Sequence, residues 1–300
     1  MSSRFRCLGF AAVLACWAGQ PVIQLSPRVI ATLEDRAVTE SSGVVASRAN
    51  PGIYWTHNDS GDGPILYAFD RYGHSYGRWT VPGAQNVDWE DIAIAPGPAP
   101  GRWYLYAGDI GDNNRVRLEI AVYRVEEPKT GSASACRAGC QTKPATAFHL
   151  RYPDGPHNAE TLLVHPVTRD VYVISKASSA DPNTTVYVAR ANQLGPKTVT
   201  LTAIATLAVP DAFSRTMVGG LTGGDISADG RKVALCDYLH YYEASLPPGV
   251  SFDDIWKQTF YPKLLGVVAQ VEGICYRADG KAFILTAEGK PCPVIEIPIE

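Results

Sequence analysis

The sequence predicts an all-β fold, a β-propeller of five four-stranded blades. The first observation is a recurring unit in which a polar residue, mostly a carboxylate, leads into a short apolar run. Such units recur every few tens of residues, which is typical of propellers and solenoids. They begin at Ser42, Glu90, Glu160, Gly224 and Glu272. The second observation is that short runs of aromatic and β-branched residues follow each unit, while helical periodicity is almost absent.

Each unit contains further strand-like runs, separated by turns that carry Gly, Pro, Asp or Asn. Second strands are expected at residues 53–56, 103–106, 171–174, 232–235 and 282–285. Third strands are expected at 66–69, 120–123, 186–189 and 294–297. Fourth strands are expected at 79–81, 148–150, 204–207 and 264–267. Residues 251–257 predict one short helix, with Ser251 as its N-cap.

The last unit lacks a fourth strand because the sequence stops at Glu300. Residues 30–33 repeat the Ile-Ala-Thr-Leu sequence of the fourth strand at 204–207. We therefore expect an N-terminal strand to lie beside residues 294–299 and close the ring, which removes exposed sheet edges. The alternative is a six-bladed ring, with a degenerate sixth blade in the long second unit, residues 91–157.

Composition and length favour one globular domain, residues 21–300. The chain is 46% hydrophobic and 19% charged, with 27 Gly and 22 Pro. Its formal charge of −3 gives no reason to expect a nucleic acid partner. We expect a monomer that binds a small molecule, a glycan or a protein.

Residues 1–20 predict an export signal, with Arg4 and Arg6 ahead of a short apolar core at 7–15. This core is too short to span a bilayer, and no other segment predicts a transmembrane helix. Two forms of processing fit equally: a bacterial lipoprotein box with a lipid on Cys16, and ordinary cleavage near Ala18. Either form predicts a secreted, periplasmic or cell-envelope protein.

The cysteines agree with export. Cys136 and Cys140 lie in a loop between the third and fourth strands of the second unit, where an oxidising compartment favours a local disulfide. A metal clip is the alternative, but no second pair has zinc-binding spacing. Cys236, Cys275 and Cys292 lie on or beside expected strands, and we expect at least one of them to be a buried small hydrophobe.

Antiparallel pairing predicts that most informative polar residues lie at one mouth of the central channel. First strands start there and second strands end there. The starts supply the candidate metal ligands Ser42, Glu90, Glu160, Glu272 and Asp225. The second-strand ends supply the candidate catalytic residues His57, Asp59, Asp109, Asp112 and Lys176.

Several glutamates on one narrow axis repel one another, so they must take up protons or share a cation. Oxygen ligands without His or Cys favour Ca²⁺. The alternative is a polar channel in which these residues cap strand ends and bind water. Likewise, Asp109 and Asp112 fit either a cation loop or an Asx turn, and His57 fits either a general base or a structural residue.

Residues 40–114 carry a family resemblance. The runs Glu40-Ser-Ser-Gly, Trp55-Thr-His-Asn-Asp-Ser-Gly, Asp88-Trp-Glu-Asp-Ile-Ala and Gly108-Asp-Ile-Gly-Asp-Asn-Asn resemble a group of exported bacterial β-propeller proteins of largely uncharacterised function. The resemblance extends over nearly the whole expected mature chain. It implies a propeller fold and an exported protein, and it implies no activity.

A weaker similarity is to the calcium-activated apyrases, which are five-bladed and hold Ca²⁺ in the channel with Ser, Glu, Glu, Ser and Glu. Ser42, Glu90, Glu160 and Glu272 stand at the matching blade starts. The fourth position departs because it is Gly224, for which Thr222 or Asp225 could substitute. The nucleotide-handling residues have no match, so the similarity implies no nucleotidase activity.

Two functions are compatible with these residues. The favoured one is a binding scaffold with Ca²⁺ in the channel mouth. The alternative is a metal-dependent hydrolase of phosphate esters, lactones or similar small esters. There Glu90, Glu160 and Glu272 would hold the metal, while Asp59, Asp109 or Asp112 would bind a second ion or act as base. Lys176 and Arg215 would offset substrate charge.

Overall fold

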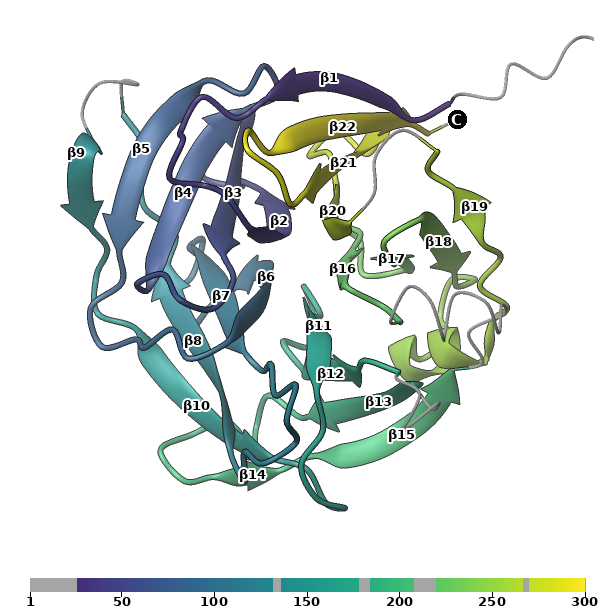
Figure 1. Cartoon of the computed structure of the whole chain (residues 1–300). Coiled ribbons are helices and arrows are strands. Elements are labelled where there is room, and N and C mark those ends of the chain that lie inside the picture. The colour runs from purple at the N-terminus through teal and green to yellow at the C-terminus, as the bar shows by residue number, and fades with distance from the viewer. Residues whose placement is uncertain (1–25, 132–135, 178–183, 208–219, 267–269, 300) are drawn as a thin grey trace, which may run out of the picture.

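The computed structural model describes residues 26–131, 136–177, 184–207, 220–266 and 270–299. It shows a β-propeller of five blades around a central axis (Figure 1). The first strand of every blade is the innermost, and adjacent first strands contact one another around the ring. The predicted fold class and the number of blades are confirmed, and the six-bladed alternative is wrong.

Each blade is an antiparallel sheet of four strands. The first blade comprises β2 (Ser41–Ala46), β3 (Ile53–Asn58), β4 (Ile65–Asp70) and β5 (Ser75–Thr80). The second comprises β6 (Trp89–Pro96), β7 (Trp103–Asp109), β8 (Ile120–Glu126) and β10 (Thr146–Arg151). The third comprises β11 (Ala159–Val164), β12 (Val171–Ser175), β13 (Thr184–Ala189) and β15 (Thr202–Leu207).

The last two blades differ in their outer strands. The fourth comprises β16 (Gly223–Ile226), β17 (Lys232–Cys236), β18 (His240–Ser245) and β19 (Lys263–Leu264). Its outer strand is much shorter than predicted, and residue 267 lies outside the described residues. The fifth comprises β20 (Val271–Tyr276), β21 (Ala282–Ala287), β22 (Pro293–Pro298) and the N-terminal strand β1 (Arg28–Thr32).

The N-terminal strand closes the ring as the repeated Ile-Ala-Thr-Leu sequence predicts. β1 pairs antiparallel with β22, with Arg28 opposite Glu296 and Thr32 opposite Pro293. The guanidinium of Arg28 donates a hydrogen bond of 2.8 Å to the Glu296 carboxylate. Because one sheet contains both ends of the described chain, the ring cannot open without breaking these pairs (Figure 1).

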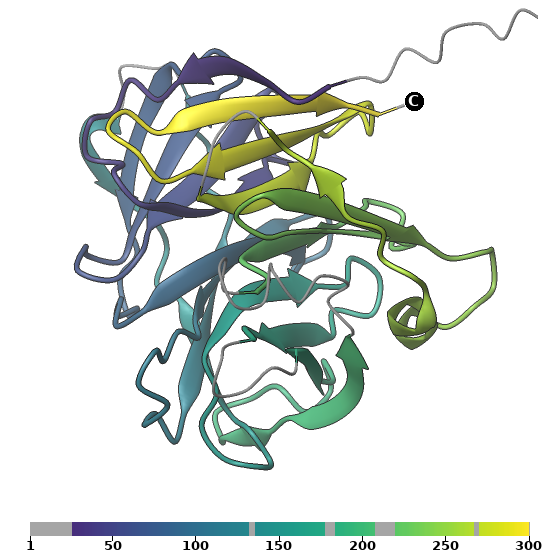
Figure 2. The same ribbon diagram turned by 45° about the vertical axis from the view of Figure 1, so that its right-hand side comes forward.

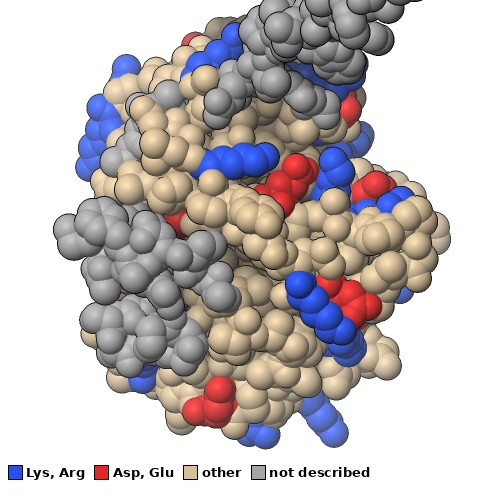
Figure 3. All heavy atoms as spheres, turned by 90° about the vertical axis from the view of Figure 1, so that its right-hand side faces the viewer, with Lys and Arg blue, Asp and Glu red and all other residues tan. Residues whose placement is uncertain are grey.

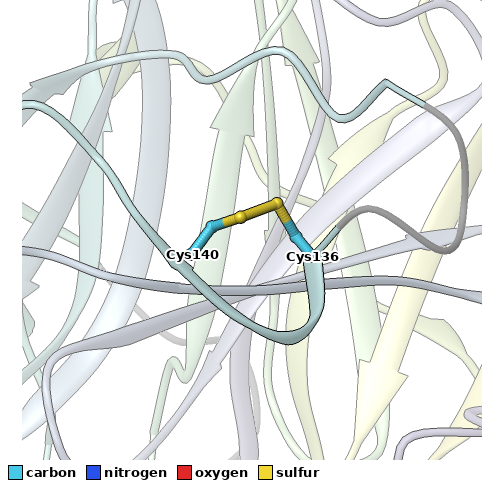
Figure 4. Close-up of a disulfide and its surroundings, with 2 residues drawn as sticks. All are labelled: Cys136 and Cys140. Carbon is cyan, nitrogen blue, oxygen red and sulfur yellow. A yellow bond between two sulfur atoms is a disulfide. The ribbon is translucent and has the colours of Figure 1, made fainter.

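The long second unit supplies an extra strand to the first blade instead of a sixth blade. Residues Cys136–Gln141 form β9, which pairs parallel with β5, and not the loop that the sequence predicts. The Cys136–Cys140 disulfide is confirmed, and it joins the two ends of the turn-like backbone of β9 (Figure 4). Similarly, β14 (Val199–Thr200) pairs parallel with β10 of the second blade. Both added strands cover outer edges that would otherwise be exposed.

The core lies between neighbouring blades, because each blade buries residues from both of its faces. The contact between the first two blades is rich in tryptophan. Trp55 and Trp79 meet edge-to-face with ring centroids 4.9 Å apart, a favoured geometry for aromatic pairs. Cys236, Cys275 and Cys292 are buried free thiols, as expected for at least one of them.

The predicted short helix is a 3₁₀ helix, η1 (Phe252–Lys257), at the outer side of the fourth blade (Figure 2). Ser251 occupies its N-cap position but makes no side-chain capping hydrogen bond. Burial of Phe252, Ile255 and Trp256 holds the helix instead. Figure 3 shows this side of the molecule, where basic and acidic side chains lie next to one another among uncharged residues. No helix in the described part of the chain is long and apolar enough to cross a membrane.

Candidate metal centre at the channel mouth

The channel mouth is the rim at which β2, β6, β11, β16 and β20 start. Four of these first strands are irregular at their first residues. The pairing register shifts between Ser41 and Val44, between Trp89 and Asp91, between Ala159 and Thr161, and between Val271 and Gly273. Bulges re-aim the side chain of the unpaired residue. The bulged segments contain four of the predicted metal ligands: Ser42, Glu90, Glu160 and Glu272.

The fourth blade is the exception, because β16 pairs with β17 without a register shift. Gly224 stands at the position of the missing ligand. A Cβ atom there would approach a methyl carbon of Leu235 to 2.9 Å and the carbonyl oxygen of Ala234 to 3.0 Å. Packing against the second strand therefore leaves no room for a serine at this position.

Three acids meet at one side of the mouth. Asp59, Asp88 and Glu90 each offer a carboxylate oxygen, and these oxygens all lie within 4.8 Å of one another. The backbone of Gly111 passes so close that a Cβ atom there would overlap carboxylate oxygens of both Glu90 and Asp88. The glycine therefore leaves this space to the carboxylates.

Glu90 is the least satisfied member of this group. Glu90 is only 3% exposed, yet its carboxylate accepts no hydrogen bond and forms no ion pair among the described residues. Glu272 is in the same situation at 5% exposed. A carboxylate in a residue this buried, with no protein donor, is costly to ionise, so a proton, a cation or channel water must offset the charge of each group.

The raised pKa values of these acids reflect this cost. Burial raises the pKa of Glu90 well above its ordinary value, and the neighbouring Glu160, Asp59, Asp88 and Glu272 raise it further. Burial and Glu160 likewise raise the pKa of Glu272. Burial and Asp59 raise the pKa of Asp88 to about 6, although Arg117 opposes the rise. The mouth therefore holds more acids than can ionise together without a positive partner.

Lys176 supplies one positive charge, and its ion pair is with Glu160. Its ammonium forms an ion pair with Glu160, donates a 3.1 Å hydrogen bond to the Tyr238 hydroxyl and lies 4.8 Å from the centre of that ring. Although burial opposes it, Glu160 and Glu272 raise the pKa of Lys176, so the side chain stays charged. Glu160 is thus directly paired, whereas Lys176 only opposes the rise in the pKa of Glu272 and forms no ion pair with it.

Ser42 and Asp225 are at the channel but are engaged elsewhere. The hydroxyl of Ser42 donates a 2.8 Å hydrogen bond to the carbonyl oxygen of Glu90. The Asp225 carboxylate accepts hydrogen bonds from the backbone N–H groups of Ile226, at 2.8 Å, and Tyr276, at 2.9 Å. Burial raises the pKa of Asp225 to about 6, and Arg48 is the charged group that opposes the rise. Its position fits a link between the fourth and fifth blades better than a ligand.

The remaining candidates are also held in place. His57 is fully buried, and burial lowers the pKa of its imidazole to about 4, so it is neutral and has no access to solvent. Asp109 accepts the backbone N–H of Asp88 at 2.9 Å and pairs with Arg117 at 3.0 Å. Asp112 accepts the backbone N–H of Arg117 at 2.7 Å. Asp109 and Asp112 therefore hold the rim loop that carries Gly111, in agreement with the turn alternative. Arg215 lies outside the described residues.

Two residues at the mouth are not among the site residues that the sequence predicts. Asp88 supplies an oxygen of the three-acid group, and Tyr238 contacts Lys176. Asp88 lies just before β6, two residues from Glu90, with Trp89 between them. Trp89 is buried between them, with its indole N–H donating 2.8 Å to the carbonyl oxygen of Gln85. This alternation was the available signal.

Comparisons with known proteins add no family. No family model matches the chain, and the search of curated proteins finds no match either.

Proposed function

We propose that the protein is an exported binding scaffold that holds Ca²⁺ at the channel mouth, where the ion organises the rim for a small molecule, glycan or protein. The single observation that carries the proposal is the buried Glu90 carboxylate, which faces Asp59 and Asp88 and has no donor among the described residues. An acid in this position gains most from a cation with oxygen preference.

The proposed ligands differ from the residues at the blade starts, because Asp59 and Asp88 join the set. Asp59, Asp88 and Glu90 form the compact group, and Glu272 is the other buried acid that lacks a partner. Glu160 would contribute only if it were released from Lys176. The donors are all oxygens, as Ca²⁺ prefers, and backbone or water oxygens would complete its coordination.

The scaffold is favoured over the hydrolase because the candidate acid–base groups are occupied. His57 is buried and neutral, Asp109 is paired with Arg117, and Lys176 is paired with Glu160. This leaves Asp59 and Asp88, which are also the proposed metal ligands. Export is part of the proposal, and the disulfide supports it, since such bonds persist in oxidising compartments.

Calcium titration tests the proposal. We expect the metal-free protein to bind Ca²⁺ in isothermal calorimetry, and to melt at a higher temperature with Ca²⁺ than with EDTA. At a hundredfold excess over the dissociation constant, the gain in unfolding free energy is about 2.7 kcal/mol. Glu90→Gln should abolish both effects, because it removes the charge and keeps the shape.

Asp254→Asn is the matched control. Asp254 also loses one negative charge in this change, but its partner is Lys257 on η1, at 2.6 Å, on the outer side of the fourth blade. It should bind Ca²⁺ like the wild type. If Glu90→Gln binds Ca²⁺ as tightly as Asp254→Asn does, the proposed centre is wrong. Calcium-dependent turnover in a panel of phosphate esters and lactones, lost in Glu90→Gln, would favour the hydrolase instead.

A further inference from the structure

A cleft lies between the first two blades, at the end of the molecule opposite the channel mouth. Its volume is about 720 Å³, within the range of small-molecule sites. It lies at this end because β2 and β6 run away from the mouth, and the turns that follow them line the cleft. The segment after β8 and the disulfide-bearing strand β9 complete its walls. Four cationic side chains line it: Arg48, Arg102, Lys129 and Lys143.

Arg48 is one of two cations in the cleft that form no ion pair within the described residues, although its charge lowers the pKa of Asp225. Its guanidinium carbon lies 5.7 Å from the centre of the Trp103 ring, a cation–π distance. Its Nε atom is buried without a hydrogen-bond partner, and its guanidinium forms no ion pair within the described part of the chain. A planar guanidinium in this state has donors left for a planar or tetrahedral oxyanion.

Glu127 fixes the turn that carries Arg48. Its buried carboxylate accepts the backbone N–H groups of Arg48, at 3.3 Å, and Ala49, at 2.9 Å, and the indole N–H of Trp55, at 2.9 Å. The hydroxyl of Ser47 donates to the same carboxylate. Glu127 is therefore saturated from the protein side, so it positions Arg48 without neutralising the guanidinium.

The other three cations of the cleft have hydrogen-bond or ion-pair partners. Arg102, at 2.9 Å, and Lys143, at 2.7 Å, share the carboxylate of Glu126. The ammonium of Lys129 donates 2.6 Å to the carbonyl oxygen of Ala49, next to Arg48, and pairs with no acid among the described residues. Arg48 and Lys129 are thus the two cations of the cleft without an acid partner among the described residues, whereas Arg102 and Lys143 are paired with Glu126.

We propose that this cleft binds a small organic molecule through an oxyanion group, a carboxylate or a phosphate, held by Arg48 and Lys129. The guanidinium of Arg48 would form the two-point contact, and the ammonium of Lys129 would add charge. The cavity is several times larger than one such group, so the rest of the ligand would pack beside Trp103 and the disulfide. This site is separate from the proposed calcium centre and needs no metal.

Calorimetry at low ionic strength tests the proposal with three probes: inorganic phosphate, citrate and glucuronate. We expect at least one probe to bind with a dissociation constant of about 1 mM or lower, since charge-assisted bidentate contacts are strong. Tighter binding of phosphate would point to a phosphate group, and tighter binding of citrate or glucuronate to a carboxylate. Arg48→Gln should weaken binding about tenfold or more, and Lys129→Gln by a smaller factor.

Two controls keep the result interpretable. Arg169→Gln removes a cation from a second cleft of about 560 Å³ beside the third blade, and it should leave binding unchanged. Glu90→Gln should also leave it unchanged, which separates this site from the calcium centre. The proposal is overturned if no probe binds at about 10 mM, or if Arg169→Gln weakens binding as much as Arg48→Gln does. Should Arg48→Gln fail to fold, Lys129→Gln, at an exposed position, decides the question alone.

Discussion

Two kinds of buried carboxylate lie next to one another along the first strands. Glu90 and Glu272 are 3% and 5% exposed, and neither accepts a hydrogen bond from any described residue. Asp91 and Asp225 are 1% and 7% exposed, but backbone N–H groups surround them. Burial is the same in both kinds, so the difference lies in the donors.

The aspartates join neighbouring blades. One oxygen of Asp91 accepts the N–H of Ile92, at 2.8 Å, and the other accepts the N–H groups of Leu162, at 2.9 Å, and Gly224, at 3.3 Å. Asp225 repeats this pattern, with one oxygen on its own strand and the other on the fifth blade. Satisfied acids thus stabilise the ring, and unsatisfied acids are available for a ligand.

The largest effect is expected from the satisfied kind. Asp91→Ala leaves three backbone N–H groups without an acceptor at the contact of three blades, and each buried orphan costs about 1–3 kcal/mol. We therefore expect the free energy of unfolding to fall by about 3 kcal/mol or more, measured by urea denaturation in EDTA. A loss below about 1 kcal/mol would contradict the role of Asp91 as a link between blades.

Substitution of the unsatisfied kind should have the opposite effect on stability. Burial raises the pKa of Asp91 and Asp225 as well as that of Glu272, so the two kinds differ in the sign of the substitution effect and not in the direction of the pKa shift. The pKa of Glu272 is raised in the folded protein, so its stabilising contribution is present below about pH 4.3, the unfolded value, and is lost as pH rises through the folded value. Glu272→Gln mimics the protonated acid. In EDTA it should match the wild type near pH 4 and become more stable than the wild type at pH 7.

The size of this gain is about 1.4 kcal/mol for each pH unit by which the folded pKa exceeds the unfolded one. Melting curves of both proteins between pH 4 and pH 8 measure it, and the difference between them contains Glu272 together with its effect on Glu90 and Lys176. Saturating Ca²⁺ should reverse the order at pH 7, because the ion then stabilises only the wild type. A variant that is less stable than the wild type in EDTA at pH 7 would show that Glu272 is satisfied.

The arrangement of the strands could be predicted from the sequence. The five blades followed from the spacing of apolar runs, and ring closure followed from the repeat of residues 204–207 at 30–33, because strand pairing depends on patterns that a sequence displays. The gathering of Glu90, Glu160 and Glu272 at one mouth followed from antiparallel geometry. The electrostatic coupling of these three acids agrees with that prediction.

The state of each acid could not be predicted in this way. Asp225 resembles a mouth ligand in sequence, and only the register of β16 and β20 shows that backbone N–H groups take up both of its oxygens. Lys176 and Glu160 are far enough apart in sequence that their pairing depends on where β12 ends. The crossing of β9 to the first blade was equally hidden, because parallel pairing with a neighbouring blade leaves no local signal.

Ser42 gives the smallest and most discriminating prediction. Its hydroxyl donates to the carbonyl oxygen of Glu90, so Ser42→Ala should cost about 1 kcal/mol of unfolding free energy, the usual value of a neutral hydrogen bond. Calcium affinity should change less than about twofold. Ser41→Ala is the matched control, because the neighbouring hydroxyl also makes one buried hydrogen bond, 2.7 Å long, to Thr56. A tenfold loss of calcium affinity in Ser42→Ala alone would make Ser42 a ligand and place the ion on the channel axis, beyond the group of Asp59, Asp88 and Glu90.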